Sequence, residues 1–254
     1  MTPDQYVNSV VNQHKLPEGL DPYTQVVIVE PLKQIISNWA GEYLCETKLS
    51  GSRAKGTAID IATDLDLFIS LSSTTPLSLK DIYNHLYNRI KQEGLAVRKQ
   101  NVSLGVTYKG YKVDLVPAKR QSQTGNDHSL YRSKVDSWTK TNIDMHINKV
   151  RRSGRITEVT ALKIWRENHG LEFPSIYLEC FAIDVLAGKS LYAPANNFLY
   201  LLRCIQDEIT TTRVVDPANT NNVLSDELTE KEKKLLSEQA RKSLSARNWE
   251  DIIW

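Results

Sequence analysis

The sequence has few cysteines, glycines and prolines, and it has no excess of charge of either sign. Its three cysteines, Cys45, Cys180 and Cys204, lie far apart and include no CxxC pair. This spacing argues against a disulfide scaffold or a zinc site, and it is typical of a protein from a reducing compartment. The 32 Lys and Arg residues nearly balance the 30 Asp and Glu residues. The overall charge therefore does not indicate a nucleic-acid partner, and such a role would need a local basic patch.

The sequence also lacks long hydrophobic segments. No apolar run approaches the roughly 18–20 residues that are needed to cross a bilayer. The N-terminus, MTPDQYVNSVVNQHK, lacks the basic and then apolar pattern of a secretory signal. We therefore expect a soluble cytoplasmic protein that does not associate with membranes. A length of 254 residues accommodates one large domain, or two smaller domains that share a core.

The first half of the chain mixes helical and strand-like patterns. Apolar residues recur at helical spacing over residues 22–40 and again over 78–94, where Ser78 is a predicted N-cap and Gly94 a predicted stop. The stretch DLDLFISL predicts a strand, and LAVRKQ, SLGVTY and KVDLVPA predict three more. The YKGY turn between the last two predicts a hairpin. Together these patterns predict an α/β module up to about residue 120.

The second half reads as mostly helical. Helical patterns cover residues 141–150, 156–169, 175–187, 194–210 and 229–244, and beyond Gly125 we identify no convincing strand. The change of character predicts two domains, 1–130 and 131–254, with a soft boundary in the loop-like composition near 120–140.

Two aspartates stand two positions apart at the start of DLDLFISL. On a strand, the side chains of Asp64 and Asp66 point to one side, and those of Leu65, Leu67 and Ile69 point to the other. Neighbouring carboxylates repel, so one of them tends to bind a proton unless a cation lies between them. Mg²⁺ favours such oxygen ligands and completes its shell with water and substrate phosphates.

A third acid, Asp114 in KVDLVPA, also alternates with apolar residues. If its strand lies beside the first, three carboxylates converge, and such a cluster can hold two metals roughly 3.5–4 Å apart. One ion would activate the attacking hydroxyl, and the other would neutralise the triphosphate and the departing pyrophosphate. We predict Asp114 to be the carboxylate nearest the acceptor hydroxyl, and hence the general base.

A polar turn, SGSRAKGT, precedes the aspartates by about a dozen residues. Small residues at Gly51 and Ser52 allow backbone N–H groups to approach phosphate oxygens, and the Ser52 hydroxyl adds a donor. Arg53 and Lys55 add positive charge. A DxD pair or a GS turn is a weak signal by itself, since most of them bind neither metal nor phosphate. The prediction of a metal and phosphate site therefore rests on the GS turn, the DxD pair and the later Asp114 occurring together in this order.

These residues resemble a known superfamily. GSRAKGT, TDLDLFI and VDLVPA resemble the signature of the DNA polymerase β-like nucleotidyltransferases, which is a GS turn, a DxD or DxE pair and a third Asp on a neighbouring strand. ALKIWRENHG, PSIYLECFA and DPANTNNV resemble the lysine-bearing helix, the SYxLE segment and the DP…NNV motif of oligoadenylate synthases. The resemblance covers residues 25–250 and points to the CD-NTase group, the bacterial relatives of oligoadenylate synthase and cyclic GMP-AMP synthase.

The resemblance implies an α+β fold with two lobes: a mixed-sheet palm with helices, and a helical C-terminal lobe that completes an NTP cleft. It assigns Gly51 and Ser52 to the triphosphate, and Lys163 and Ser175 to the terminal phosphates. The three aspartates would hold two Mg²⁺ ions, with Mn²⁺ as a substitute. Here the segment reads SIYLE rather than SYxLE, so the base-stacking role of the family's aromatic residue is in doubt for Tyr177.

The resemblance further implies a synthase that makes cyclic or linear oligonucleotide second messengers from NTPs in antiphage signalling, without a nucleic-acid activator. One alternative is template-independent addition of nucleotides to RNA or tRNA, for which the basic run KVRRSGR (residues 149–155) is the candidate contact. A second alternative is a non-catalytic nucleotide sensor or toxin partner. The presence of all three acids argues against it.

Overall fold

The computed structural model describes residues 1–62 and 64–254, which divide into two compact units. The sheet unit comprises Pro17–Lys55 and 64–147, and the helical unit comprises Met1–Leu16, Gly56–Ala62 and Asn148–Trp254. The sequence predicts one boundary at 130/131. In the structure, two segments of the first half, Met1–Leu16 and Gly56–Ala62, belong to the helical unit, and the sheet unit ends at Ile147. Among the described residues, no helix combines the length and apolarity required to span a bilayer.

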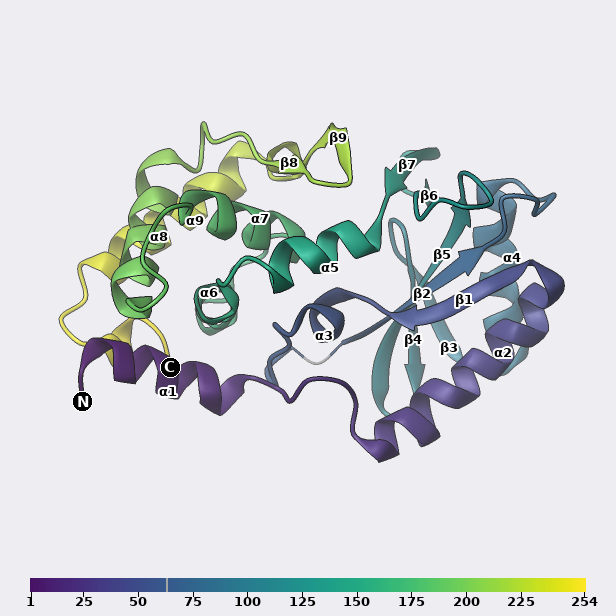
Figure 1. The fold of residues 1–254 in the computed structure, drawn as a ribbon, viewed down its shortest axis with the longest axis horizontal. Helices are drawn as coiled ribbons and strands as arrows, with labels where there is room; N and C mark the ends of the chain where they lie inside the picture. Colours follow the sequence, from purple (N-terminus) through teal and green to yellow (C-terminus); the bar gives the residue numbers. More distant parts are fainter. Residues whose placement is uncertain (63) are drawn as a thin grey trace. The chain divides into compact units, whose positions relative to one another are not determined.

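The sheet unit begins with helices interspersed with strands and ends with five successive strands (Figure 1). Its elements are the π-helix Thr24–Val29, α2 Glu30–Ala40, the 3₁₀ turn Gly41–Tyr43, β1 Leu44–Leu49, α3 Gly51–Lys55, β2 Leu65–Leu71, α4 Leu79–Gln92, β3 Ala96–Lys99, β4 Leu104–Tyr108, β5 Tyr111–Arg120, β6 His128–Arg132 and β7 Ser137–Thr141. The division between the units falls within α5, Ile143–Arg151.

The described strands form a seven-stranded mixed sheet in the order β1-β2-β5-β4-β3, with β6 beside β5 and β7 beside β6. β2 and β5 run parallel, and the other neighbouring strands run antiparallel. On one side, β5 pairs with β4 as far as Leu115 and with β6 from Ala118 onward. Pro117 falls between these two stretches, so its missing N–H interrupts neither ladder.

One face of the sheet packs on helices to form the core of this unit. Alternate residues of β2 and β5 are buried there against α2 and α4, and α4 contributes Ile82, Leu86 and Ile90. The Ser78 hydroxyl accepts the N–H of Asp81 and caps α4. The opposite face carries Asp66 and Asp114, because side chains alternate along each strand. Burying one face against helices therefore directs the two acids to the other.

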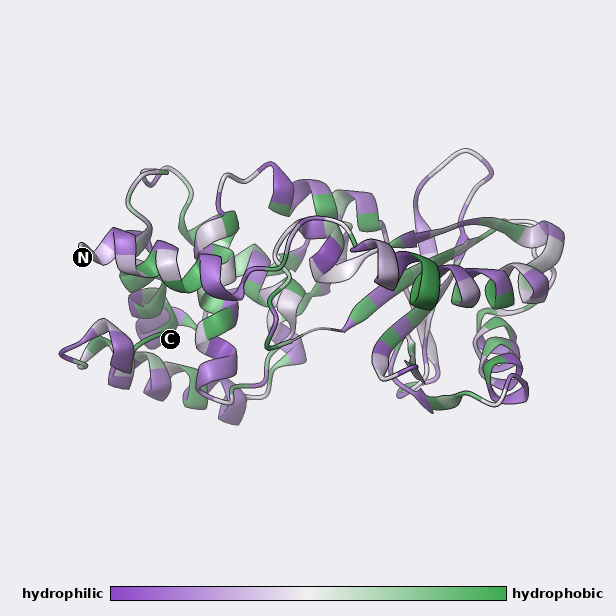
Figure 2. Cartoon of the chain, turned by 90° about the horizontal axis from the view of Figure 1, so that it is seen from below, coloured by the Kyte–Doolittle hydropathy of each residue, from purple (hydrophilic) through white to green (hydrophobic). Residues whose placement is uncertain are grey.

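The helical unit has its own hydrophobic core. Its elements are α1 Pro3–His14, α6 Ile156–Asn168, α7 Ser175–Val185, α8 Pro194–Glu208, β8 Val215–Asp216, β9 Asn219–Val223, the 3₁₀ turn Leu224–Glu227, α9 Glu230–Leu244 and the 3₁₀ turn Trp249–Asp251. Trp165 is fully buried, and its Nε1 donates to Ser243 Oγ at 3.0 Å. Three valines of α1 are buried in the same core, which explains why residues 1–16 belong to this unit. Helices in both units show mixed purple and green bands, as amphipathic packing requires (Figure 2).

The predicted elements agree with the structure up to β5, and the YKGY hairpin is present with positive φ at Lys109 and Gly110. The expectation of no strand beyond Gly125 is wrong, since β6, β7, β8 and β9 follow it. These strands are two to five residues long. Several are largely polar, so they carry little alternation. The predicted polar turn is also replaced by the short helix α3.

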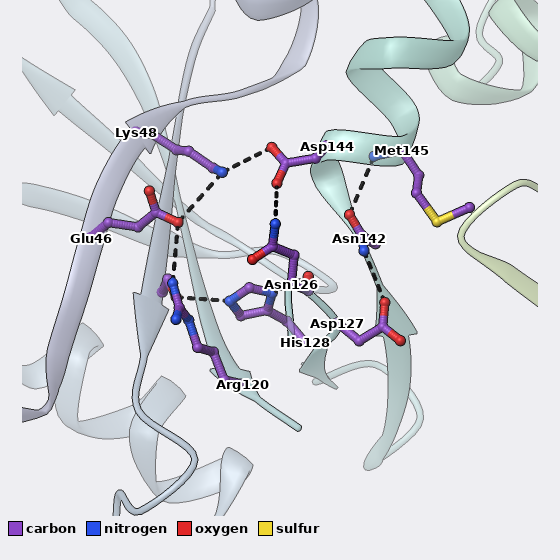
Figure 3. Close-up of polar contacts among 10 residues, drawn as sticks. Glu46, Lys48, Arg120, Asn126, Asp127, His128, Asn142, Asp144 and Met145 are labelled. Atoms are coloured by element: carbon purple, nitrogen blue, oxygen red, sulfur yellow. Dashed lines mark hydrogen bonds and ion pairs between the residues drawn. The ribbon is translucent and has the colours of Figure 1, made fainter. Parts of the chain in front are cut away.

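A polar network ties the first turn of α5 to the sheet (Figure 3). Lys48 Nζ lies 2.9 Å from Asp144 Oδ1 and 3.4 Å from Glu46 Oε1, and Arg120 Nη2 lies 3.6 Å from the same Glu46 oxygen. The side chain of Asn126 donates to Asp144 Oδ2 at 3.1 Å. Charges from β1, β5 and α5 therefore balance one another on this side of the sheet.

His128 lies buried within this network. Its Nδ1 is 2.8 Å from the Asn126 carbonyl, which only accepts, so Nδ1 carries the hydrogen. Ser70 Oγ accepts from Arg120 Nε at 3.0 Å and donates to His128 Nε2 at 2.8 Å. Burial lowers the pKa of His128. The hydrogen bond to the Asn126 carbonyl opposes this effect, the charges of Arg120 and Lys48 lower the pKa further, and the charge of Glu46 raises it.

The pH dependence of stability tests this arrangement. A histidine whose pKa is lowered by folding contributes stability that is complete above its unfolded pKa of about 6.5 and is lost as the pH falls through the folded value. We expect the free energy of unfolding to fall with acidification below about pH 6.5 by at most ~1.4 kcal/mol per pH unit for this one proton. His128→Gln should have a flatter profile in chemical denaturation. Parallel profiles for the two proteins would contradict this assignment.

Candidate active site

Asp66 and Asp114 are direct neighbours in the sheet. They occupy the same register position of the parallel pair β2–β5, where adjacent strands are about 4.8 Å apart. Both are half-buried, and both lie on the face opposite the helix-covered core. The sequence prediction that the third acid lies on a strand beside the DxD strand is therefore confirmed for this pair.

Asp64 lies immediately before β2 and is exposed, so it is not part of the strand on which it was predicted. Its negative charge nevertheless affects the pKa of Asp114. Burial raises the pKa of Asp114, and the negative charge of Asp64 raises it further, whereas Arg98, Gln100 and Ser103 act in the opposite direction. Asp114 thus carries negative charge that its protein surroundings do not fully compensate.

The donor chemistry of these three residues fits a divalent cation. Carboxylate oxygens are the ligands that Mg²⁺ and Mn²⁺ prefer, and the raised pKa of Asp114 marks a position where positive charge is favourable. Among the described residues, however, no three His, Cys, Asp or Glu side chains are already gathered closely enough to hold an ion.

Gly51 is in close contact with the Asp66 carboxylate. A Cβ atom added to Gly51 would lie 1.8 Å from Asp66 Oδ2, and the φ of Gly51 is +58°. Both the space and the backbone conformation therefore require glycine here. The Ser50 N–H also donates to the Asp66 carbonyl at 2.9 Å, which fixes the loop against β2. The predicted small-residue segment thus lies directly beside the acidic pair.

Ser52 follows on the five-residue helix α3 and is half-buried. Lys55, predicted to add local positive charge, is instead buried. Arg53 is half-buried, and burial lowers the pKa of its guanidinium, against the opposing charges of Asp21 and Tyr111. The local positive charge near Gly51 is therefore less available to a ligand than the sequence suggests.

The other two predicted nucleotide contacts belong to the helical unit. Lys163 is buried, and its Nζ donates to the Thr57 carbonyl at 2.9 Å. Ser175, the first residue of α7, is half-buried and accepts from Arg166 Nη1 at 3.1 Å. Both side chains thus have protein partners, and their contact with phosphates stays a prediction.

Two further motif residues have structural roles. Tyr177 is buried between Phe173 and Phe181, and burial raises its pKa to about 12. This position gives no base-stacking surface. Asn222 lies on β9, and its Nδ2 donates to Asp216 Oδ2 at 3.2 Å across the β8–β9 hairpin.

Sequence reasoning missed Arg98 and Gly105, which lie beside Asp114 on β3 and β4. Gly105 pairs with both Asp114 and Arg98. An isolated glycine within a predicted strand signals close approach of another group, so SLGVTY contained the necessary clue. Here the approaching groups are the side chains of Arg98 and Gln100, whose Nε and Nε2 would lie 2.8 Å and 3.0 Å from a Cβ on Gly105.

Comparison with known proteins places this geometry in context. No protein-family model matches the sequence. The cyclic AMP-AMP-AMP synthase of Escherichia coli (strain MS 115-1) is 26% identical over 156 residues, which are 56% of this chain and 49% of that protein. The chain thus spans about half the length of the curated relative that it matches.

The structural similarity extends over almost the whole chain. CdnC of E. coli MS115-1, solved in complex with HORMA-deltaN, superposes with a TM-score of 0.73 at 18% identity and covers 98% of this chain and 96% of its own. CdnG of Bradyrhizobium diazoefficiens, a CD-NTase solved with GTP, gives 0.76 at 13% identity, with 99% and 95% covered.

The fold is therefore that of a nucleotidyltransferase, with a mixed sheet and helices as predicted. Within that class, the chain shares the fold of the CD-NTases CdnC and CdnG over almost its whole length, and part of its sequence is similar to a cyclic AMP-AMP-AMP synthase. The resemblance and the fold class that the sequence predicts are both confirmed.

Replacing Gly51 tests the contact with Asp66. In Gly51→Ala, the new Cβ displaces the Asp66 carboxylate, and we expect nucleotidyl transfer to fall by about 100-fold or more, as misplacement by about 1 Å commonly causes. Gly94→Ala is the matched control, because Gly94 has φ +74° and open space around it. Both variants bear the backbone strain, and only the first should lose activity. Equal losses in the two variants would contradict the role of Gly51.

Asp114→Asn tests the uncompensated charge. A carboxyl whose pKa is raised by folding contributes stability below its unfolded pKa, and this stability is lost as the pH rises through the folded value. At neutral pH without divalent cations we therefore expect the substitution to raise Tm, by about 2–4 °C for each kcal/mol. Added Mg²⁺ should raise the Tm of the wild type but not that of the variant. A lower Tm for the metal-free variant would contradict this account.

Proposed function

We propose that the protein joins NTPs, with release of pyrophosphate, into a cyclic or linear oligonucleotide second messenger of bacterial antiphage signalling. The observation that carries the proposal is the side-by-side placement of Asp66 and Asp114, with Gly51 against the Asp66 carboxylate. The curated relative is named a cyclic AMP-AMP-AMP synthase, and a structural relative was solved with GTP. These names support an NTP substrate.

In the proposed reaction the acceptor hydroxyl oxygen bonds to the α-phosphorus of the donor NTP. The bond between the α-phosphorus and the bridging oxygen breaks, and pyrophosphate leaves. Asp114, the carboxyl with the raised pKa, accepts the hydroxyl proton. Gly51 and Ser52 bind the triphosphate through backbone N–H groups and the Ser52 hydroxyl.

Asp64, Asp66 and Asp114 would hold two Mg²⁺ ions, for which Mn²⁺ can substitute. Bound ions would supply Lewis acidity for the acceptor hydroxyl and charge neutralisation for the leaving pyrophosphate. The chain's own contribution is to keep the carboxylates adjacent through the β2–β5 register, and to keep the space beside Asp66 open through Gly51.

The remaining parts of the proposal concern the helical unit and the cellular setting. Contact of Lys163 and Ser175 with the terminal phosphates would require them to exchange their bonds to Thr57 and Arg166. The protein would act in the cytoplasm without a nucleic-acid activator. The complex of a structural relative with HORMA-deltaN makes a HORMA-type partner a condition to include in assays.

Incubation of the pure protein with radiolabelled NTPs and Mg²⁺ or Mn²⁺ tests the proposal. We expect phosphatase-resistant product and pyrophosphate, and mass spectrometry identifies the base composition and ring size. The double variant Asp64→Asn, Asp66→Asn should lower product formation by about 1,000-fold or more, because it removes two of the three predicted metal ligands. No product from any NTP combination, with or without partner or DNA, would contradict the proposal.

The same assay separates the alternatives. Extension of added tRNA or RNA in preference to free NTP coupling would favour the template-independent transferase. A pure binding role should survive the double aspartate change, so partner or nucleotide binding without product in both proteins would favour the non-catalytic alternative.

A further inference from the structure

A shallow pocket lies beside Asp114 on the same face of the sheet. Its volume is about 280 Å³, and three neighbouring strands form its floor. The strand register places six of its eight lining residues in two rows of three, Arg98–Gly105–Asp114 and Ala96–Thr107–Lys112. The first row continues from Asp114 to Asp66 on β2.

The floor of this pocket is small, and its edges are cationic. Gly105 has no side chain, and the side chain of Arg98 lies over it, because a Cβ there would be 2.8 Å from Arg98 Nε. Two strand spacings, about 10 Å, separate the backbones of Arg98 and Asp114, a span that an extended arginine crosses in large part. The Arg98 charge accordingly acts on Asp114.

Both cations have donors that the protein does not use. Arg98 and Lys112 are exposed, and neither side chain forms a hydrogen bond or an ion pair with another residue in the described ranges 1–62 and 64–254. The guanidinium presents five N–H donors in a fixed fork, and the ammonium presents three. A phosphate bound between them would be held by charge-assisted hydrogen bonds.

The order of residues along the face indicates which nucleotide this phosphate belongs to. Gly51, which we propose to bind the donor triphosphate, adjoins Asp66, and the pocket adjoins Asp114 on the other side of the pair. The acceptor hydroxyl must reach Asp114 in the proposed reaction. An anion beyond Asp114, away from Gly51, is therefore placed on the acceptor side.

We propose that Arg98 and Lys112 form a subsite that binds a 5′-phosphate of the acceptor nucleotide, and that Gly105 keeps this subsite open. The inference rests on the proposed function and adds the recognition of the acceptor to it. The subsite selects a phosphorylated acceptor, either an NTP or the end of a growing oligonucleotide, over a nucleoside.

The test uses substrates that separate the donor from the acceptor. A 2′,3′-dideoxynucleoside triphosphate serves only as donor, because it lacks both attacking hydroxyls. The acceptors are a nucleoside, its 5′-monophosphate and its α,β-methylene triphosphate, which cannot donate. Each is supplied at subsaturating concentration, with all four bases tested, and coupled product is measured by mass spectrometry.

We expect the wild type to use phosphorylated acceptors at least about 10-fold better than the nucleoside, equivalent to ~1.4 kcal/mol. In Lys112→Gln this preference should fall by up to about 10-fold, while the KM of the donor and the rate with the nucleoside stay close to wild type. In Arg98→Gln the preference should fall by the same factor, in addition to a change common to all acceptors, because Arg98 also acts on Asp114. Gly105→Ala should lower the preference as well although both cations remain, since its Cβ displaces Arg98; the same Cβ also meets Gln100 Nε2, so a change common to all acceptors accompanies the loss. Lys91→Gln, which removes an exposed lysine on α4, is the matched control.

Equal loss with all acceptors in Arg98→Gln would overturn the subsite, because Arg98 would then act through Asp114. Transfer by the wild type without preference among the acceptors would overturn it as well. Failure of the wild type to transfer to any acceptor would instead contradict the proposed function, and the subsite with it. Thermal unfolding of each variant confirms that the fold is retained.

Discussion

The parallel pairing of β2 with β5 brings two carboxylates side by side on the open face of the sheet, and the candidate site depends on this electrostatic conflict. Neighbouring carboxylates are unfavourable without a cation, and burial raises the pKa of Asp114, with the charge of Asp64 raising it further. Such an arrangement persists only where the rest of the sheet fixes the register. The buried residues that alternate with the acids along the two strands, among them Leu65, Leu67 and Leu115, fix the register, because a slip by one residue would turn them to the open face.

The sequence predicted the structure well where the buried residues and the functional residues alternate with the period of a strand. The alternation in DLDLFISL and KVDLVPA gives both the core residues and the direction of Asp66 and Asp114, and the helix signals at Ser78 and Gly94 were sufficient for α4. Asp64 was predicted less well. It stands outside the strand that the pattern extended to it, where no hydrogen-bond ladder holds its side chain to one face.

The parts that could not be predicted depend on contacts between distant segments. β6 and β7 are short and partly polar, and they are strands because β5 offers an edge beside Ala118. Lys163 is directed to the Thr57 carbonyl by the packing of the helical unit, which no local pattern reveals. The contact of Gly51 with Asp66 and that of Gly105 with Arg98 likewise arise from strand neighbours, although each glycine marked the position in advance.

A crystal structure with Mn²⁺ and a non-hydrolysable NTP, analysed by anomalous scattering, tests the central claim most directly. The account predicts manganese peaks within coordination distance of Asp66 and Asp114, with Asp64 turned toward them and the triphosphate on the Gly51 side. Manganese bound elsewhere, or a triphosphate bound away from the Asp66–Asp114 pair, would contradict it.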